Sequence, residues 1–237
     1  MTSPHVTLEL LDHALVVHLD DGKANALSAD VIADLGKAVD LAEHDESIAA
    51  IVLHGREGKF CAGFDLNVMR GGDLQAMSRL VCDGGVLVRR LYGSGIPLVA
   101  ACTGHALAAG ALMLLGCDVR IGADVDCKIG LNEVAIGMVL PDWAMTIAAA
   151  RLNPGHLQRA VANARVTAAH EAVRVGFLDE VVDADQVLTR AIECANEMVG
   201  LNRKAYAGTV RSLRGATLKL MGEQIAADRA FGNVPTA

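Results

Sequence analysis

Two turns rich in glycine and alanine constrain the possible folds of this chain more than any other feature of its sequence. They lie at residues 59–66 (KFCAGFDL) and 104–112 (GHALAAGAL), and each follows an apolar, strand-like run. Because the side chains there are short, main-chain N–H groups can come close to a ligand. Two such turns facing one point could hold an oxygen that becomes negatively charged during a reaction. The alternative is that glycine and alanine only permit close packing of a loop on a strand, but the pair is more specific than either turn alone.

Strand-like and helix-like segments alternate along the chain. Strands are expected over residues 7–10, 14–19, 49–53, 98–101, 119–121, 128–130 and 177–182, and helices over residues 29–43, 77–92, 109 onward, 143–152 and 168–175. Ser28 and Thr167 are expected to cap the first and last of these helices. The alternation predicts an α/β domain, and the helices that follow indicate an appended helical region. We therefore expect a core over residues 1–184 and a C-terminal helical region over residues 185–237.

Composition excludes several classes of partner. The net charge is −7, so neither a nucleic acid nor an anionic membrane surface would be attracted to the chain. No apolar run is long and uncharged enough to span a bilayer, and the N-terminus does not combine basic residues with an apolar stretch. We expect a cytoplasmic protein that binds neither nucleic acid nor membrane.

Neither a metal nor a nucleotide cofactor is expected. The six cysteines form no Cys-x-x-Cys pair, and the eight histidines are scattered along the chain. There is no Gly-x-Gly-x-x-Gly turn that opens a helix and no P-loop. One histidine, His105, falls inside a glycine- and alanine-rich turn, where a local hydrogen-bonding or packing role is expected in preference to catalysis.

Three further segments complete a resemblance to a known family. They are residues 25–27 (NAL), 97–101 (PLVAA) and 129–137 (IGLNEVAIG). Together with the two turns, they resemble the crotonase superfamily, the enoyl-CoA hydratase/isomerase family, from about residue 5 to about residue 185. The resemblance implies a spiral of β-β-α repeats whose C-terminal helices serve trimer contacts, and hence a homotrimer or a dimer of trimers. It also implies an acyl-CoA thioester substrate, with coenzyme A entering as part of that substrate.

The resemblance also places the oxyanion-hole donors. They fall on the backbone N–H groups of Phe64 and Ala109. The remaining substrate and coenzyme A positions that match are Lys23, Ala24, Ala26, Ala62, Gly63, Asp65, Leu66, Gly110 and Leu112. Lys23 is the first candidate for a coenzyme A phosphate, with Lys59 and Arg70 behind it. Asp65 is expected to anchor the first turn through backbone hydrogen bonds.

Glu133 is the candidate base. A thioester makes the neighbouring C–H acidic, so an enzyme acting there needs one base near that carbon as well as donors around the oxygen. Glu133 lies among apolar residues, which raise a carboxyl pKa and make it a better proton carrier. The competing interpretation from local sequence alone is a surface glutamate that caps a loop.

A second acid is missing from the matching position. Family hydratases carry another glutamate where this chain has Leu112, and hydration benefits from two carboxylates. Moving a proton between two carbons needs only one, so the chain resembles the single-glutamate 3,2-enoyl-CoA isomerases most. We predict such an isomerase. Asp142 could instead supply the second acid of a hydratase, although a helix N-cap before Trp143 is the favoured interpretation of this residue. A third alternative is an inactive homologue that only binds CoA thioesters.

Overall fold

A six-stranded sheet forms the base of the molecule. The computed structural model describes residues 4–232. The strand order is β1-β2-β3-β5-β7-β9, with β1 antiparallel to β2 and every other neighbour parallel. These strands are β1 (Val6–Leu11), β2 (Ala14–Leu19), β3 (Ala50–Gly55), β5 (Leu98–Cys102), β7 (Val119–Ala123) and β9 (Glu180–Val182). The central strands are apolar on both faces because both faces are covered.

A second, smaller sheet alternates with the first along the chain. It contains the parallel strands β4 (Gly58–Cys61), β6 (Gly104–Leu107) and β8 (Ile129–Gly130). Each strand of this sheet follows a strand of the large one, so the chain winds as a β-β-α spiral. Glycines permit the close crossing between turns of the spiral: a Cβ at Gly104 would lie 2.1 Å from the carbonyl oxygen of Gly58.

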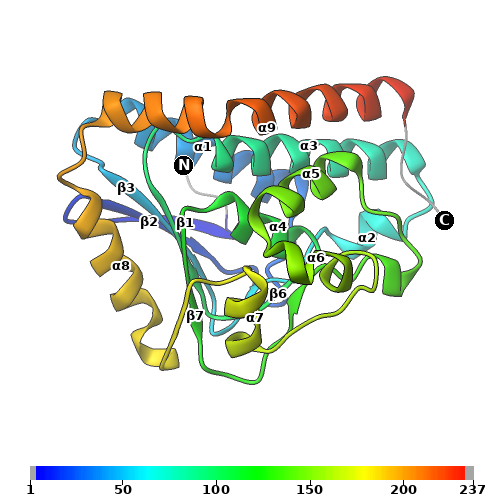
Figure 1. The fold of residues 1–237 in the computed structure, drawn as a ribbon, viewed down its shortest axis with the longest axis horizontal. Helices are drawn as coiled ribbons and strands as arrows, with labels where there is room; N and C mark the ends of the chain where they lie inside the picture. The colour runs from blue at the N-terminus through cyan, green and yellow to red at the C-terminus, as the bar shows by residue number, and fades with distance from the viewer. Residues whose placement is uncertain (1–3, 233–237) are drawn as a thin grey trace.

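Helices cover both faces of the large sheet (Figure 1). They are α1 (Ala29–His44), α2 (Leu66–Met69), α3 (Leu74–Tyr92), α4 (Ala109–Gly116), α5 (Asp142–Arg151), α6 (Pro154–Ala160), α7 (Ala169–Val175), α8 (Val187–Met198) and α9 (Arg203–Phe231), with 3-10 turns at Val134–Ile136 and Ala184–Gln186. The main core lies between the two sheets and α1, α3, α4 and α5. A second core lies between α8 and the other face of the large sheet.

The last helix is fastened to the body of its own chain. It runs along α3 and α5, across the top of Figure 1. Asp118 accepts a hydrogen bond from the Arg214 guanidinium at 2.5 Å and another from the Tyr206 hydroxyl at 2.8 Å. The Arg203 guanidinium donates to four carbonyl oxygens at the end of α1 and beyond it. The C-terminal region predicted from residue 185 therefore packs against the core through both of its helices. Residues 1–3 of the predicted core and residues 233–237 of the predicted C-terminal region lie outside the described residues.

The predicted α/β class is confirmed, with two local corrections. The four-residue strands β4 and β6 were interpreted as parts of turns, because a period of two cannot be read from so few residues. The prediction that Thr167 caps a helix is wrong, since α7 begins after Ala168 and the Thr167 hydroxyl donates to the carbonyl of Ile129 instead. The Ser28 cap is confirmed by its bond from the Val31 N–H.

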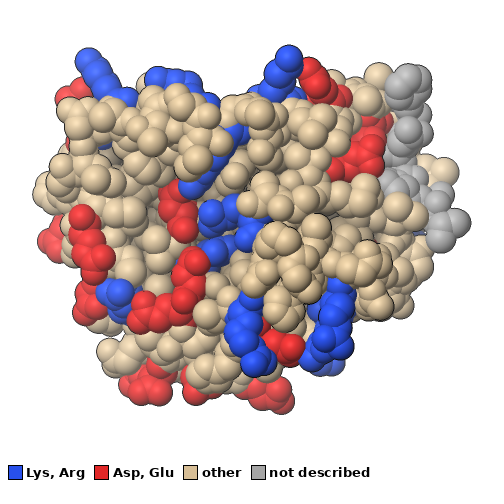
Figure 2. Space-filling view, viewed as in Figure 1, with Lys and Arg blue, Asp and Glu red and all other residues tan. Residues whose placement is uncertain are grey.

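The surface mixes charges of both signs. On the face seen in Figure 2, basic and acidic side chains interleave between wide uncharged areas. Within residues 4–232, no helix is both long enough and apolar enough to cross a membrane.

Candidate active site

The first glycine-containing turn is held from one side by the segment after β2. The Leu27 N–H donates to Gly63 O at 2.8 Å, and Leu27 O accepts from the Asp65 N–H at 3.1 Å. Among the described residues, no hydrogen bond uses the N–H of Phe64, which lies between these two contacts. Asp65 fixes the next step, because its carboxylate accepts the Asn67 N–H at the start of α2, as predicted. Within the described part of the chain, the Phe64 N–H therefore stays unpaired in a stretch of backbone that is held on both sides.

The second turn presents the other donor. Ala109 is the first residue of α4, so its N–H has no partner within the helix, and no other described group accepts it. Ala108 precedes it at φ 50° and ψ −121°, a conformation that favours glycine. The N–H of Ala108 donates to Gly130 O at 3.0 Å. This bond ties the second turn to the strand that leads to Glu133.

The two turns touch each other. A Cβ at Gly63 would lie 3.2 Å from both Ala108 Cβ and Leu107 O, and a Cβ at Gly110 would lie 2.1 Å from Cys61 O. Close approach therefore requires glycine at position 110, and at position 63 the tight contact adds to a φ of +102°, which other residues rarely adopt. The structure brings the two predicted donor turns to one place, which their separation in the sequence could not show.

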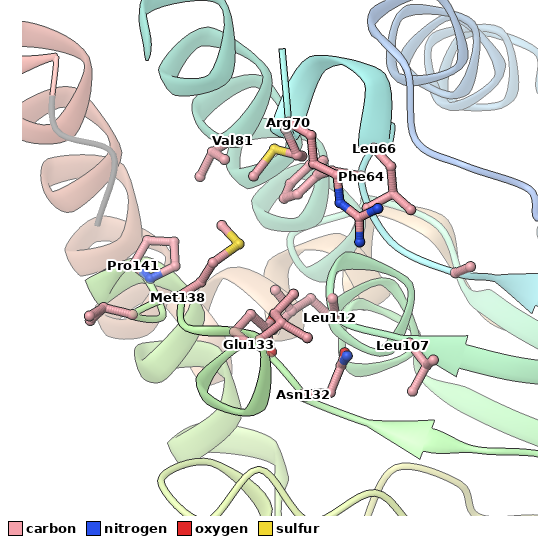
Figure 3. A pocket seen from close by; sticks show the side chains of 15 residues that line it. Phe64, Leu66, Arg70, Val81, Leu107, Leu112, Asn132, Glu133, Met138 and Pro141 are labelled. Carbon is pink, nitrogen blue, oxygen red and sulfur yellow. The ribbon is translucent and has the colours of Figure 1, made fainter. Parts of the chain in front are cut away.

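A cavity of about 330 Å³ opens beside these turns. Phe64, Leu66, Arg70 and Val81 approach it from the α2 and α3 side in Figure 3, and Glu133 and its neighbours approach from the opposite side. Its lining is predominantly apolar and consists of Ala62, Phe64, Leu66, Met69, Arg70, Val81, Leu107, Ala108, Leu112, Asn132, Glu133, Ile136, Met138, Val139 and Pro141. A pocket of this kind suits a ligand that places an apolar group in the cavity and is oriented by a few polar atoms of the wall.

Glu133 is buried at the wall of this cavity. It is 8% exposed, and its Oε2 atom has no hydrogen-bond partner among the described residues. Burial raises the pKa of its carboxyl from 4.5 to about 7. The backbone is fixed by hydrogen bonds from the Ile136 and Met138 N–H groups to Glu133 O, at 3.0 and 2.9 Å. The predicted direction of the pKa shift is confirmed, and the surface-glutamate alternative is wrong.

Leu112 and Asp142 lie in different surroundings. Leu112 is buried in the first turns of α4 and lines the cavity. Asp142 is exposed, is the first residue of α5 after the N-cap Pro141, and does not contact the cavity. Its charge acts instead on Asp228, whose pKa is raised by desolvation first and by Asp142 second. Among the described residues that line the cavity, Glu133 is therefore the one carboxylate.

The other predicted substrate positions fall into two groups. Ala62 and Leu66 line the cavity, but Lys23, Ala24, Ala26, Gly63, Asp65 and Gly110 do not. Ala24 and Ala26 belong to a loop fixed by Asp21, whose carboxylate accepts the N–H groups of Lys23, Asn25 and Ala26. Lys23 is exposed on that loop, and no ion pair within residues 4–232 engages it. A cation without a partner at this position is available to a ligand.

Asn132 is a cavity residue that we did not single out from the sequence. Its Oδ1 atom is buried without a hydrogen-bond partner among the described residues, directly before Glu133 in the chain. The sequence signal that could have identified Asn132 was a polar residue placed between an apolar residue and the candidate base. His105 meets its prediction, because its Nδ1 lies 3.0 Å from the Lys128 N–H and accepts it.

Comparison with known proteins identifies the family. The family model described as "Enoyl-CoA hydratase/isomerase" matches residues 12–234. The chain belongs to the enoyl-CoA hydratase/isomerase family. It is 31% identical over 215 residues to the mitochondrial enoyl-CoA delta isomerase 1 of Mus musculus, covering 90% of this chain and 74% of the relative.

A hydratase is similar to nearly the same degree. The short-chain-enoyl-CoA hydratase of Clostridium acetobutylicum is 30% identical over 198 residues, covering 82% of this chain and 75% of the relative. Among solved structures, an enoyl-CoA hydratase/isomerase family protein from Pseudomonas syringae superposes with a TM-score of 0.92 at 34% identity, covering 97% of this chain and 98% of that one. The fold is that of the crotonase superfamily, and the chain is an enzyme of this family.

Proposed function

We propose that this enzyme moves the double bond of a 3-enoyl-CoA ester to the 2-position. The observation that carries the proposal is the cavity lining, in which Glu133 faces the site as the one carboxylate among the described residues and Leu112 stands where a hydratase has its second acid. Similarity to the mouse isomerase is consistent with it.

The proposed reaction uses one base and two donors. The Glu133 carboxylate removes a proton from C2, and the electron pair of that C–H bond forms a dienolate across C2, C3 and C4. The Phe64 and Ala109 N–H groups hold the negative thioester oxygen; one such donor is typically worth about 3 kcal/mol of barrier. The carboxylic acid then returns its proton to C4, so that the C3–C4 double bond is lost and a C2–C3 double bond forms.

Burial suits Glu133 to both halves of this transfer. A carboxyl whose pKa is about 7 exists in both protonation states near neutral pH, so it can accept and release a proton with little driving force lost in either direction. The apolar lining also limits access of water to the intermediate.

Hydration of a 2-enoyl-CoA ester is the second candidate. The similarity to the hydratase of Clostridium acetobutylicum favours it. Against it, Asp142 is exposed and outside the cavity lining, so Glu133 lacks a carboxylate partner there to hold and polarise a water. A protein that only binds CoA thioesters is the least favoured alternative, since it would have no need of a buried base.

Binding of the rest of the substrate is assigned to the surface near the cavity. We propose that Lys23 contacts a coenzyme A phosphate, that Arg70 at the cavity wall assists it, and that no metal or other cofactor takes part. We also propose a homotrimer or a dimer of trimers, as the family resemblance implies.

An assay with purified protein separates these alternatives. The kcat/KM for isomerisation of a 3-enoyl-CoA is measured against that for hydration of the 2-enoyl-CoA of equal length, with and without a chelator. We expect isomerisation to exceed hydration at least tenfold, roughly 1.4 kcal/mol in barrier, and chelation to change neither rate. Rapid hydration with untouched 3-enoyl esters would overturn the isomerase proposal, and activity that depends on added metal would overturn the cofactor proposal.

A further inference from the structure

A glycine in the middle of α3 lies directly under the ring of Phe64. A Cβ built on Gly84 would be 2.3 Å from Phe64 Cε1 and 2.5 Å from Phe64 Cζ, closer than real contacts allow. The ring therefore occupies the space that any other side chain at this position would fill. Glycine weakens a helix interior, so its presence within the 19 residues of α3 calls for a local reason.

The contact is specific to this point of the fold. Gly36 lies in the interior of α1, and a Cβ there would meet nothing within 4 Å. Gly85, the neighbour of Gly84, faces Trp143 in the core instead, at 2.8 Å from its Cε2 atom. Two adjacent glycines of α3 thus receive two different aromatic rings, and one of these rings belongs to the candidate active site.

The Phe64 ring and the Phe64 N–H are constrained together. Hydrogen bonds from and to Leu27 hold the backbone on either side of Phe64, and α3 holds the ring. Val81 lies one helical turn before Gly84 and lines the cavity, as Phe64 does. If the ring were lifted from α3, it would have to move toward the cavity or rotate the short segment that carries the N–H.

We propose that Gly84 is a positioning residue for the oxyanion hole. Because glycine has no side chain, the Phe64 ring packs directly against α3. In this position the Phe64 backbone N–H points at the thioester oxygen, and the ring stays out of the space for the acyl group. The role rests on the proposed function only in assigning the Phe64 N–H as a donor, which isomerisation and hydration would share.

A double-mutant cycle tests this role. Gly84→Ala is expected to lower kcat at least tenfold on whichever enoyl ester the unmodified enzyme turns over, with a smaller effect on KM. Phe64→Ala keeps the N–H and removes the ring, so in that background Gly84→Ala should lower kcat less than twofold. Gly36→Ala, the matched control in α1, should leave kcat and KM unchanged. An equal loss of kcat from Gly84→Ala in both backgrounds would overturn the proposal.

Thermal unfolding gives a second readout that does not need activity. Without the ring, Gly84→Ala should raise Tm, as is also expected of Gly36→Ala, because alanine favours a helix. In the presence of the ring it should lower Tm. A rise in Tm of the same size in both backgrounds would overturn the proposal even if the assays showed no turnover. A different result would overturn the proposed isomerase function, namely that the unmodified enzyme leaves 3-enoyl esters unchanged.

Discussion

Glu133 combines three properties that a proton carrier needs. It faces the cavity, one of its oxygens has no partner among the described residues, and burial raises its pKa to about 7. The burial and the direction of the shift could be predicted from its apolar neighbours in the sequence. The position of Asp142 outside the cavity could not be predicted, because the direction in which the first residue of α5 faces depends on how that helix packs.

Glu133→Gln should reduce turnover by at least two orders of magnitude. The amide keeps the shape of the side chain but cannot accept the proton. Steady-state rates at pH 8 measure the loss, and circular dichroism establishes that the variant is folded. Turnover within a few-fold of the unmodified enzyme would show that another group is the base.

The activity of the unmodified enzyme should depend on pH through the same carboxyl. The proton acceptor is the ionised form, so kcat/KM should rise about tenfold per pH unit below pH 7 and level off above it. A profile already flat from pH 5 upward would mean that the base has an ordinary carboxyl pKa.

Stability provides an independent measure of that titration. The folded-state pKa lies above the unfolded value, so between pH 4.5 and about 7 the folded protein binds more protons and Glu133 becomes progressively destabilising as pH rises. Relative to pH 4.5, Glu133→Gln should therefore gain about 3 kcal/mol over the unmodified protein by pH 8. Denaturant unfolding at the two pH values tests this, and a constant difference would contradict it.

At the scale of elements, we expect the start of α4 to determine whether the cavity supports isomerisation or hydration. Ala109 supplies a donor from its first residue, and Leu112 presents an apolar side chain to the cavity within its first turns. Leu112→Glu should raise hydration of a 2-enoyl-CoA and narrow the predicted tenfold preference for isomerisation, because a second carboxylate can hold water opposite Glu133. The two specificity constants measure the effect. An unchanged ratio in a folded variant would show that this position does not set the reaction.

The sequence predicted elements better than it predicted contacts between them. The helical spacing of apolar residues located α1 within one residue of its observed end, and Ser28 caps it as expected. The strands β4 and β6 escaped detection because they lie at the starts of the two segments that were interpreted as glycine- and alanine-rich turns. The contact between Gly84 and Phe64 could not be predicted either, since periodicity does not state which face of α3 meets which turn.

At the scale of the whole molecule, the C-terminal helices bury one face and expose another. Val210, Met221 and Ile225 of α9 are buried against the body of the chain, whereas Leu213 is 77% exposed and Leu220 is 46% exposed. The last two are seven residues apart and so lie on the same side of the helix. An apolar stripe of this kind is available to a neighbouring subunit.

We therefore expect a homotrimer or a dimer of trimers in solution. Light scattering at micromolar concentration should give three or six times the mass of one chain. Leu213→Glu should shift the distribution toward smaller species if α9 contributes to the contact, while Lys219→Glu on the same helix changes a charge without removing an apolar group. A stable monomer of the unmodified protein would contradict the expected assembly.

The most direct test of a single proton carrier follows the proton itself. A 3-enoyl-CoA ester carrying deuterium at both C2 positions is converted in ordinary water, and the label in the product is located by NMR. Because Glu133 is 8% exposed and the cavity is largely apolar, the deuteron taken from C2 should be returned to C4 before it exchanges with water. We predict deuterium at C4 in a detectable fraction of the product, since transfer within the buried, apolar site competes with exchange with water. A product with only protium at C4 would contradict the claim that one buried carboxyl carries the proton between the two carbons.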